Sequence, residues 1–265
     1  MDKKTRVPRL SGIVFVVLFC FFQGCAARHT IPQISNALPP NELAYYSDSF
    51  DELRNDLWDR TGLLFRQEQL KNFRSADMRI EHGQLVIRSH VGSFSKGGLG
   101  SNFMLRGDYD VQIDCQFNFI KEPVDMDQIL SFVALEQGPD GHETRGWVSM
   151  TLIKVPGKEN RILFNYRDFR DWERILKIGW HSTGDFNGTF RIVRAGKRVF
   201  ISYRRGDGPW RQADVFPSIG GDTHFGMVCQ NFILQRKSIH ATQPVIGRFD
   251  NFKINAAQGI LEEDI

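Results

Sequence analysis

A tryptophan set among planar polar side chains is the feature of this sequence best suited to bind a ligand. In residues 145–155, the apolar Val148, Met150 and Leu152 alternate with Arg145, Trp147, Ser149 and Thr151. An indole can stack on the CH face of a sugar ring, while amides and guanidinium groups hydrogen-bond to its hydroxyls. Residues of these types on one side of a strand are therefore typical of saccharide recognition.

Further polar side chains alternate with apolar ones in two other segments, residues 109–119 and 161–167. If these segments and residues 145–155 are neighbouring strands, one face combines the following ligand-binding candidates: Trp147, Arg145, Gln116, Asn118, Asn165 and Arg167. The alternative is that Trp147 packs beneath a loop or a second layer of the fold, because tryptophan side chains are commonly buried.

Paired carboxylates of the kind used in glycoside hydrolysis are not evident. Asp110 and Asp114 fall on one side of a strand, but four residues of extended chain separate them by about 13 Å. The carboxyl groups of a retaining glycosidase lie about 5.5 Å apart. No catalytic residue is therefore assigned, and the acids to test first for an enzyme are Glu136, Asp168 and Asp171.

Sequence signatures of metal, phosphate and nucleophile chemistry are also missing. His142 is followed by Glu143 but by no second histidine at the spacing of a zinc site. The glycine-rich residues 97–102 precede neither a Lys-Ser or Lys-Thr pair nor a helix, so we expect a flexible connection between strands. We expect no cofactor. Calcium is possible in the loops, but no acidic loop marks a site, and the metal is left unknown.

The charge of the chain argues against one class of partner. The sequence has 34 basic and 31 acidic residues, and its first 24 residues contain four of the basic ones and one of the acidic ones. The rest of the chain is therefore neutral. Because nucleic acid binding needs a basic surface, we expect no nucleic acid partner.

The first 25 residues have the order of a secretory signal. Basic residues precede an unbroken apolar run over residues 13–22, shorter than the roughly 20 residues that span a membrane. The run leads into Phe22-Gln23-Gly24-Cys25, which resembles the lipobox of bacterial lipoproteins. We therefore predict lipidation of Cys25 and attachment to the membrane, and Ala26 after it favours the outer membrane or cell surface. The alternative is an ordinary cleaved signal with Cys25 unmodified.

From residue 43 onward, the hydrophobic pattern has the period of two that is typical of strands. Strands are expected over residues 83–91, 109–119, 127–137, 146–155, 161–167, 175–180, 189–194, 199–205, 224–232 and 249–254. So many short strands with almost no helical pattern predict an all-β fold, an antiparallel sandwich of two sheets.

The domain organisation follows from the signal and the strands. We predict a signal peptide over residues 1–24, a lipidated cysteine with an extended tether over 25–42, the β-sandwich over 43–258 and a C-terminal tail over 259–265.

Several side chains have an expected place in the sandwich. Gly196 should adopt a positive φ in a hairpin turn, and Trp180 should lie in the core because it alternates in phase with Leu176 and Ile178. Trp58 and Trp210 are expected at the edge of the core. For the cysteines, we favour buried thiols at Cys115 and Cys229 over a disulfide between them.

The order of several short motifs resembles the concanavalin A-like lectin/glucanase superfamily, in particular laminin-G-like bacterial jelly-roll domains. The resemblance covers about residues 45–256. It rests on Ser49-Phe50-Asp51, Gly83-Gln84-Leu85-Val86-Ile87, Gly107-Asp108-Tyr109-Asp110-Val111, Arg191-Ile192-Val193-Arg194, Gly208-Pro209-Trp210 and Phe249-Asp250-Asn251-Phe252-Lys253-Ile254. It implies a jelly roll of two curved sheets, a fold that often carries saccharide on its concave face.

The resemblance does not by itself imply a reaction, since one fold hosts many functions. Glucanases of this superfamily carry a Glu-x-Asp-x-x-Glu motif, which the sequence lacks. We therefore expect an exported, lipid-anchored jelly roll that binds a poly- or oligosaccharide. The alternatives are a glycoside hydrolase or lyase with an unrecognised site, and a structural or interaction module of an envelope complex.

Overall fold

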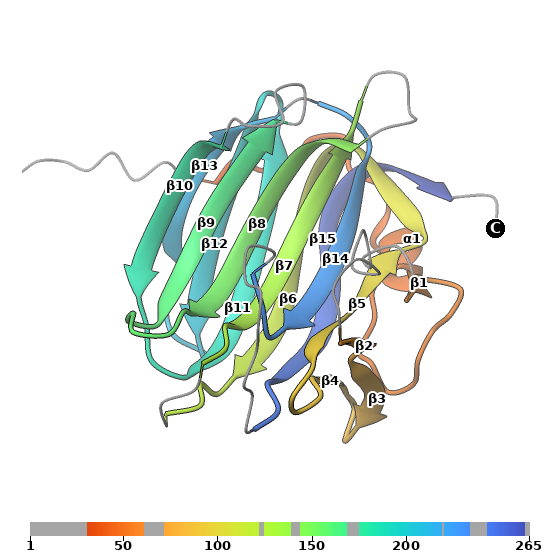
Figure 1. The fold of residues 1–265 in the computed structure, drawn as a ribbon. Coiled ribbons are helices and arrows are strands. Elements are labelled where there is room, and N and C mark those ends of the chain that lie inside the picture. The colour runs from red at the N-terminus through yellow and green to blue at the C-terminus, as the bar shows by residue number, and fades with distance from the viewer. Residues whose placement is uncertain are drawn as a thin grey trace, which may run out of the picture. The chain divides into compact units, whose positions relative to one another are not determined.

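The described part of the chain consists mainly of β-strands (Figure 1). In this computed structural model, it comprises residues 31–60, 72–121, 125–138, 144–168, 175–218, 220–233 and 243–262. The side chains of residues 144, 145, 175 and 176 are not described. Signal, lipidation and the first part of the tether, residues 1–30, lie outside this range, as does Asp171.

One short helix and fifteen strands make up the described elements. They are α1 (Pro40–Tyr45), β1 (Trp58–Asp59), β2 (Phe73–Ser75), β3 (Asp77–Glu81), β4 (Gln84–Arg88), β5 (Phe94–Ser101), β6 (Phe103–Phe117), β7 (Gln128–Gln137), β8 (Thr144–Lys154), β9 (Arg161–Asp168), β10 (Ile175–Ser182), β11 (Phe186–Ala195), β12 (Arg198–Arg205), β13 (Arg211–Pro217), β14 (Thr223–Gln230) and β15 (Ile246–Glu262). No helix in these ranges is long and apolar enough to cross a membrane.

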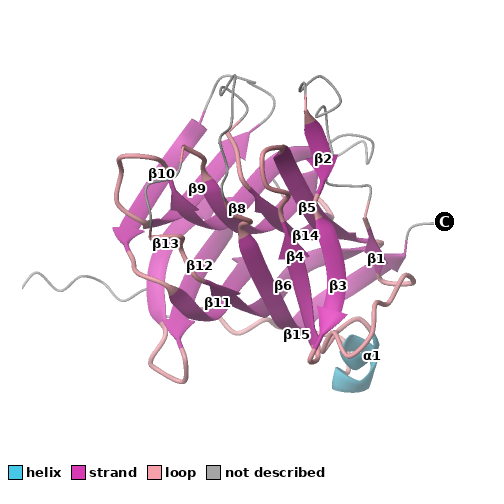
Figure 2. Ribbon diagram, turned by 60° about the horizontal axis from the view of Figure 1, so that its bottom comes forward, coloured by secondary structure: helices cyan, strands magenta, loops and turns pink. Residues whose placement is uncertain are grey.

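The strands form two layers that face each other (Figures 1 and 2). The first sheet has the order β10-β9-β8-β7-β14-β5, with β1 and β2 beside β5, and the second has the order β13-β12-β11-β6-β15-β4-β3. The sheets are joined where Leu105 of β6 pairs with Thr223 of β14. All pairings are antiparallel except the one between β2 and β5. The predicted all-β sandwich of two antiparallel sheets is therefore confirmed.

The core lies between the two layers and is rich in aromatic rings. Tyr109 of the second sheet and Phe225 of the first meet edge to face, with ring centroids 5.3 Å apart. Phe132 and Phe252 make a similar contact across the layers at 6.3 Å. Along β6, every second residue from Tyr109 to Phe117 is buried, as the alternation predicts.

The environments predicted for the two cysteines and for Gly196 are confirmed, and the one predicted for Trp58 is wrong. Cys115 and Cys229 are buried free thiols, and burial raises the pKa of both. Gly196 has a φ of 57° in the turn between β11 and β12. Trp58 is only 2% exposed, so it belongs to the core and not to its edge.

The glycine-rich residues 97–102 are not a flexible connection. Most of them belong to β5, which pairs with β14 from Lys96 to Gly100. A Cβ atom on Gly97 would lie 2.9 Å from the Cβ of Ala76, so the close packing of this strand requires glycine there. The sequence pattern missed the strand because glycines interrupt its alternation.

Both ends of the sandwich extend beyond the predicted boundaries. Strand β15 continues to Glu262, which pairs with Phe103, so residues 259–262 are not a tail. Before residue 43, the amide of Leu38 donates to the carbonyl of Ala257 at 2.7 Å, and Leu38 packs against the core. The C-terminal part of the predicted tether is thus attached to the sandwich.

Candidate functional site

Trp147 lies on the outer surface of the first sheet. In β8 its neighbours Val148, Met150 and Leu152 are fully buried in the core. Because successive side chains of a strand point to opposite faces, Trp147 points away from the core, as the alternation predicts. Its side chain is partly exposed.

Two of the predicted partners lie beside Trp147 on β9. Arg167 is paired with Trp147 in the strand register, and its guanidinium carbon lies 5.3 Å from the centre of the indole. Asn165 is paired with Ser149 and donates to its hydroxyl at 3.3 Å. The cation–π contact and the hydrogen bond fix a planar cation and an amide next to the indole.

A second tryptophan lies on the same face, contrary to the sequence-based prediction. Trp180 of β10 was expected in the core but is 46% exposed, and Ile178 is 50% exposed. In the register, Trp180 is paired with Leu163 and Ile178 with Asn165. The guanidinium carbon of Arg161 lies 4.0 Å from the centre of a ring of Trp180.

The reason for the reversed orientation lies at the edge of the first sheet. The inward positions of β10 carry polar residues that find partners on the second sheet. Lys177 forms an ion pair with Asp214 of β13, and His181 hydrogen-bonds to the hydroxyl of Tyr203 at 3.0 Å. Ile178 and Trp180 of this edge strand are therefore the apolar side chains that face outward.

We call the outer surface of β8, β9 and β10 the tryptophan face. It consists of Trp147, Arg161, Asn165, Arg167, Ile178 and Trp180. Trp147 and Trp180 are separated by two strand spacings across the sheet and by four residues along the strands. Strand spacing and rise then place their backbones about 16 Å apart. Such a separation suits an extended ligand better than a single small ring.

Gln116 and Asn118 do not join the tryptophan face. Gln116 belongs to β6 and Asn118 comes directly after it, and β6 pairs with β11 and β15 in the second sheet and not with β8 or β9. Their side chains therefore lie on the opposite outer surface of the sandwich. Arg145 belongs to β8, but its side chain is outside the described part. Alternation correctly assigned the inner and outer sides of β6, β8 and β9, but it could not show which strands are neighbours.

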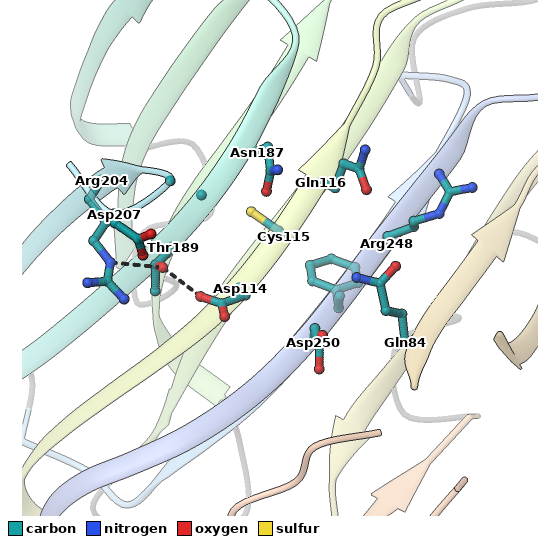
Figure 3. Close-up of a pocket in the computed structure, with 13 residues that line it drawn as sticks. Gln84, Asp114, Cys115, Gln116, Asn187, Thr189, Arg204, Asp207, Arg248 and Asp250 are labelled. Carbon is teal, nitrogen blue, oxygen red and sulfur yellow. Dashed lines mark hydrogen bonds between the residues drawn. The ribbon is translucent and has the colours of Figure 1, made fainter. Parts of the chain in front are cut away.

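The outer surface of the second sheet has its own concave features. Gln116 lines a hollow of about 230 Å³ (Figure 3), and Asn118 lines a second one of about 610 Å³. Neither was expected from the sequence, because both depend on strands that are distant along the chain.

Comparison with known proteins identifies the fold. No family model and no curated protein matches the chain in sequence. The laminarinase from Flavobacterium sp. UMI-01 matches with a TM-score of 0.58 and 9% identity, covering 78% of this chain and 97% of that one. The GlcNAcα1-4Gal-releasing endo-β-galactosidase from Clostridium perfringens matches with a TM-score of 0.55 and 12% identity, covering 85% and 65%. The CBM2 module of the evolved Dit of Lactobacillus casei BL23 phage J-1 matches with a TM-score of 0.51 and 12% identity, covering 79% and 95%.

The chain has the concanavalin A-like jelly-roll fold. The fold implied by the order of the sequence motifs is thus confirmed.

The central strands of the jelly roll's first sheet offer no carboxylate to a ligand on the tryptophan face. The outward positions of β7, β8, β9 and β14 in the described ranges carry neither Asp nor Glu. A retaining pair of carboxyl groups about 5.5 Å apart is therefore missing from these strands.

The acids named for an enzymatic alternative point elsewhere. Glu136 is fully buried, accepts a hydrogen bond from Ser218 at 2.5 Å and is paired with Arg194, so it has a structural role. Asp168 alternates in phase with the core residues Phe164 and Tyr166 and is 8% exposed. Neither carboxylate therefore lies on the tryptophan face.

Titration and metal binding add little to this face. Burial lowers the pKa of Lys96, on β5 of the same sheet, to about 8. Within the described ranges, no group of three or more His, Cys, Asp and Glu side chains is arranged to hold a metal ion.

Proposed function

We propose that this jelly roll binds carbohydrate noncovalently through the tryptophan face. The observation that carries the proposal is the outward, partly exposed indole of Trp147 beside Arg167 and Asn165. The indole can stack on the apolar face of a sugar ring while the guanidinium and amide groups hydrogen-bond to its hydroxyls. The neighbouring hydrogen bond to Ser149 restrains the amide before a ligand arrives, which lowers the entropy cost of binding.

The position of Trp180 supports an oligosaccharide as the ligand. Its exposed indole provides a second stacking surface about 16 Å from Trp147 by strand geometry. Asn165 and Ile178 lie between the two indoles in the register. A ligand that contacts both tryptophans must extend across three strands.

The named neighbours support the same class of ligand. A laminarinase and an endo-β-galactosidase share the fold, and their names describe proteins that act on saccharides. The absence of Asp and Glu from the outward positions of the central strands supports binding without turnover.

A binding assay on a glycan array that includes laminarin and mucin O-glycans tests the proposal. We expect the whole chain to bind at least one glycan, and Trp147→Ala to weaken that binding about tenfold through the loss of about 1.4 kcal/mol of stacking. Tyr45→Ala is the matched control, because Tyr45 is an aromatic residue that is 53% exposed on α1.

Three outcomes overturn this function. The first is that the whole chain binds no glycan, and the second is that Trp147→Ala binds like the control. The third is turnover of a polysaccharide that is lost in Asp168→Asn, which would show a glycoside hydrolase or lyase. A stoichiometric protein partner without glycan affinity would instead show an envelope interaction module.

We also propose that the protein is exported and attached through a lipid on Cys25 to the bacterial outer membrane or cell surface. The proposal rests on the basic residues, the apolar run and the lipobox-like residues before that cysteine. Cells labelled with radioactive palmitate should incorporate label into the wild-type chain and not into Cys25→Ser. Equal labelling of both chains, or of neither, contradicts lipidation.

A further inference from the structure

Three polar side chains without partners form a row across the middle of the second sheet. In the strand register, Gln116 of β6 is paired with Asn187 of β11 on one side and Arg248 of β15 on the other. All three line the hollow in Figure 3, where they extend from neighbouring strands. Within the described ranges, none of them makes a hydrogen bond or an ion pair. Their donors and acceptors are therefore free for a ligand.

The next row of the same hollow is held in place by its own hydrogen bonds. Thr189 donates to Asp114 Oδ1 at 2.5 Å and accepts from Arg204 Nε at 3.1 Å. The side-chain amide of Asn251 donates to Asp114 Oδ2 at 3.1 Å. Asp250 lies opposite Asp114 in the register. One side of the hollow is thus a preorganised polar surface, while the other side presents unpaired groups.

The hollow continues toward the end of β6. Arg248 lines both the hollow of about 230 Å³ and the neighbouring one of about 610 Å³, which also includes Asn118 and Asp185. We call the two together the polar trough. Because they share Arg248, a ligand can extend from Asp114 past Gln116 to Asn118.

The charges of the trough favour a ligand that is neutral and both donates and accepts hydrogen bonds. The lining of the smaller hollow includes the cations Arg204 and Arg248 and the carboxylates Asp114, Asp207 and Asp250. An anion would meet three carboxylates, and a cation would meet two guanidinium groups. Sugar hydroxyls satisfy both kinds of group, since each donates one hydrogen bond and accepts two.

We propose that the polar trough is a second saccharide-binding site, which takes an uncharged oligosaccharide along β6. It shares the ligand class of the proposed function but none of its residues. The trough and the tryptophan face lie on opposite outer surfaces of the sandwich. One molecule can therefore hold two glycan chains and bridge them.

Affinity electrophoresis in gels that contain laminarin or mucin O-glycans tests the trough. We expect Arg248→Ala and Gln116→Ala each to weaken retention about fivefold to tenfold, because each removes hydrogen bonds to the ligand. Gln112→Ala is the matched control. Gln112 lies on the same side of β6, four residues from Gln116, and interacts with Asn255 outside the trough. Equal melting temperatures of the three variants will show that the fold is intact.

Combination with Trp147→Ala separates this site from the tryptophan face. Retention that survives Trp147→Ala and disappears when Arg248→Ala is added supports the trough. If Trp147→Ala alone abolishes all retention, the trough is overturned while the tryptophan face stands. If Arg248→Ala abolishes retention and Trp147→Ala changes nothing, the trough stands and the proposed function fails. Equal retention of Arg248→Ala, Gln116→Ala and Gln112→Ala, or no retention of the wild-type chain, overturns the trough.

Discussion

Glu136 and Arg194 form an ion pair that is completely buried between the two sheets. Arg194 Nη1 lies 3.5 Å from Glu136 Oε1, and the two side chains are 1% and 0% exposed. Arg194 Nε also donates to the carbonyl of Gly107 at 2.7 Å, and Nη1 donates to the hydroxyl of Thr223 at 3.0 Å. Through these bonds the arginine connects β11 with the start of β14 and with Gly107 of β6, near the point where the sheets join.

Arg194→Ala should lower the free energy of unfolding by about 3–5 kcal/mol, because it removes the cation that is paired with the buried carboxylate of Glu136. Urea unfolding measures the change. Arg106→Ala is the control, since its ion pair with Asp222 is largely exposed and should contribute less than about 1 kcal/mol. Adding Glu136→Gln to Arg194→Ala should restore part of the loss. Similar losses for the Arg194 and Arg106 variants would contradict the structural role of the buried pair.

Asp48 supports the core tryptophan Trp58. Its two carboxylate oxygens accept hydrogen bonds from Trp58 Nε1 at 2.6 Å and from the amide of Phe50 at 2.7 Å, and both bonds are buried. Asp48→Ala should therefore lower the free energy of unfolding by about 2–3 kcal/mol, because two buried donors lose their acceptor. Asp48→Asn keeps one acceptor oxygen and should cost less. Urea unfolding that ranks the two variants in the opposite order would refute this role.

The sequence predicted what alternation determines locally. The inner and outer sides of β6, β8 and β9 were read correctly, including the outward position of Trp147, because strand periodicity fixes the side on which each residue lies. The order of motifs also indicated the jelly roll. The first of these features depends only on residues that are close along the chain, and the second depends on the order of short local motifs.

The sequence did not predict what depends on pairing between distant segments. Gln116 was placed next to Trp147, although β6 belongs to the second sheet. The apolar alternation around Trp180 gave the wrong side, because polar partners from β12 and β13 reach the inward positions of β10 at the sheet edge. The free row of Asn187, Gln116 and Arg248 comes from three strands, and only their register brings it together.

Asp250 should make the stability of the fold depend on pH. Burial, with a smaller effect of the nearby carboxylates, raises its pKa above the usual 3.8. The folded state therefore favours the protonated form, and this contribution to stability is fully present below pH 3.8 and is lost as the pH rises through the raised pKa. The unfolding free energy of the wild type minus that of Asp250→Asn should fall between pH 3 and pH 7, roughly the range of carboxyl titration. A difference that is constant or rises with pH would show that the carboxyl group is not perturbed in this way.

Trp180 should determine the length of saccharide that the tryptophan face recognises. Its indole and that of Trp147 are about 16 Å apart by strand geometry, so only an extended ligand can contact both. Trp180→Ala should weaken binding of a long laminarin oligosaccharide about tenfold and leave binding of the disaccharide from the same glucan unchanged, since the short ligand stacks on Trp147 alone. Isothermal titration of both ligands measures the two effects, and Trp147→Ala should weaken both. Equal effects of Trp180→Ala on the short and the long ligand would mean that the two indoles do not act along one glycan chain.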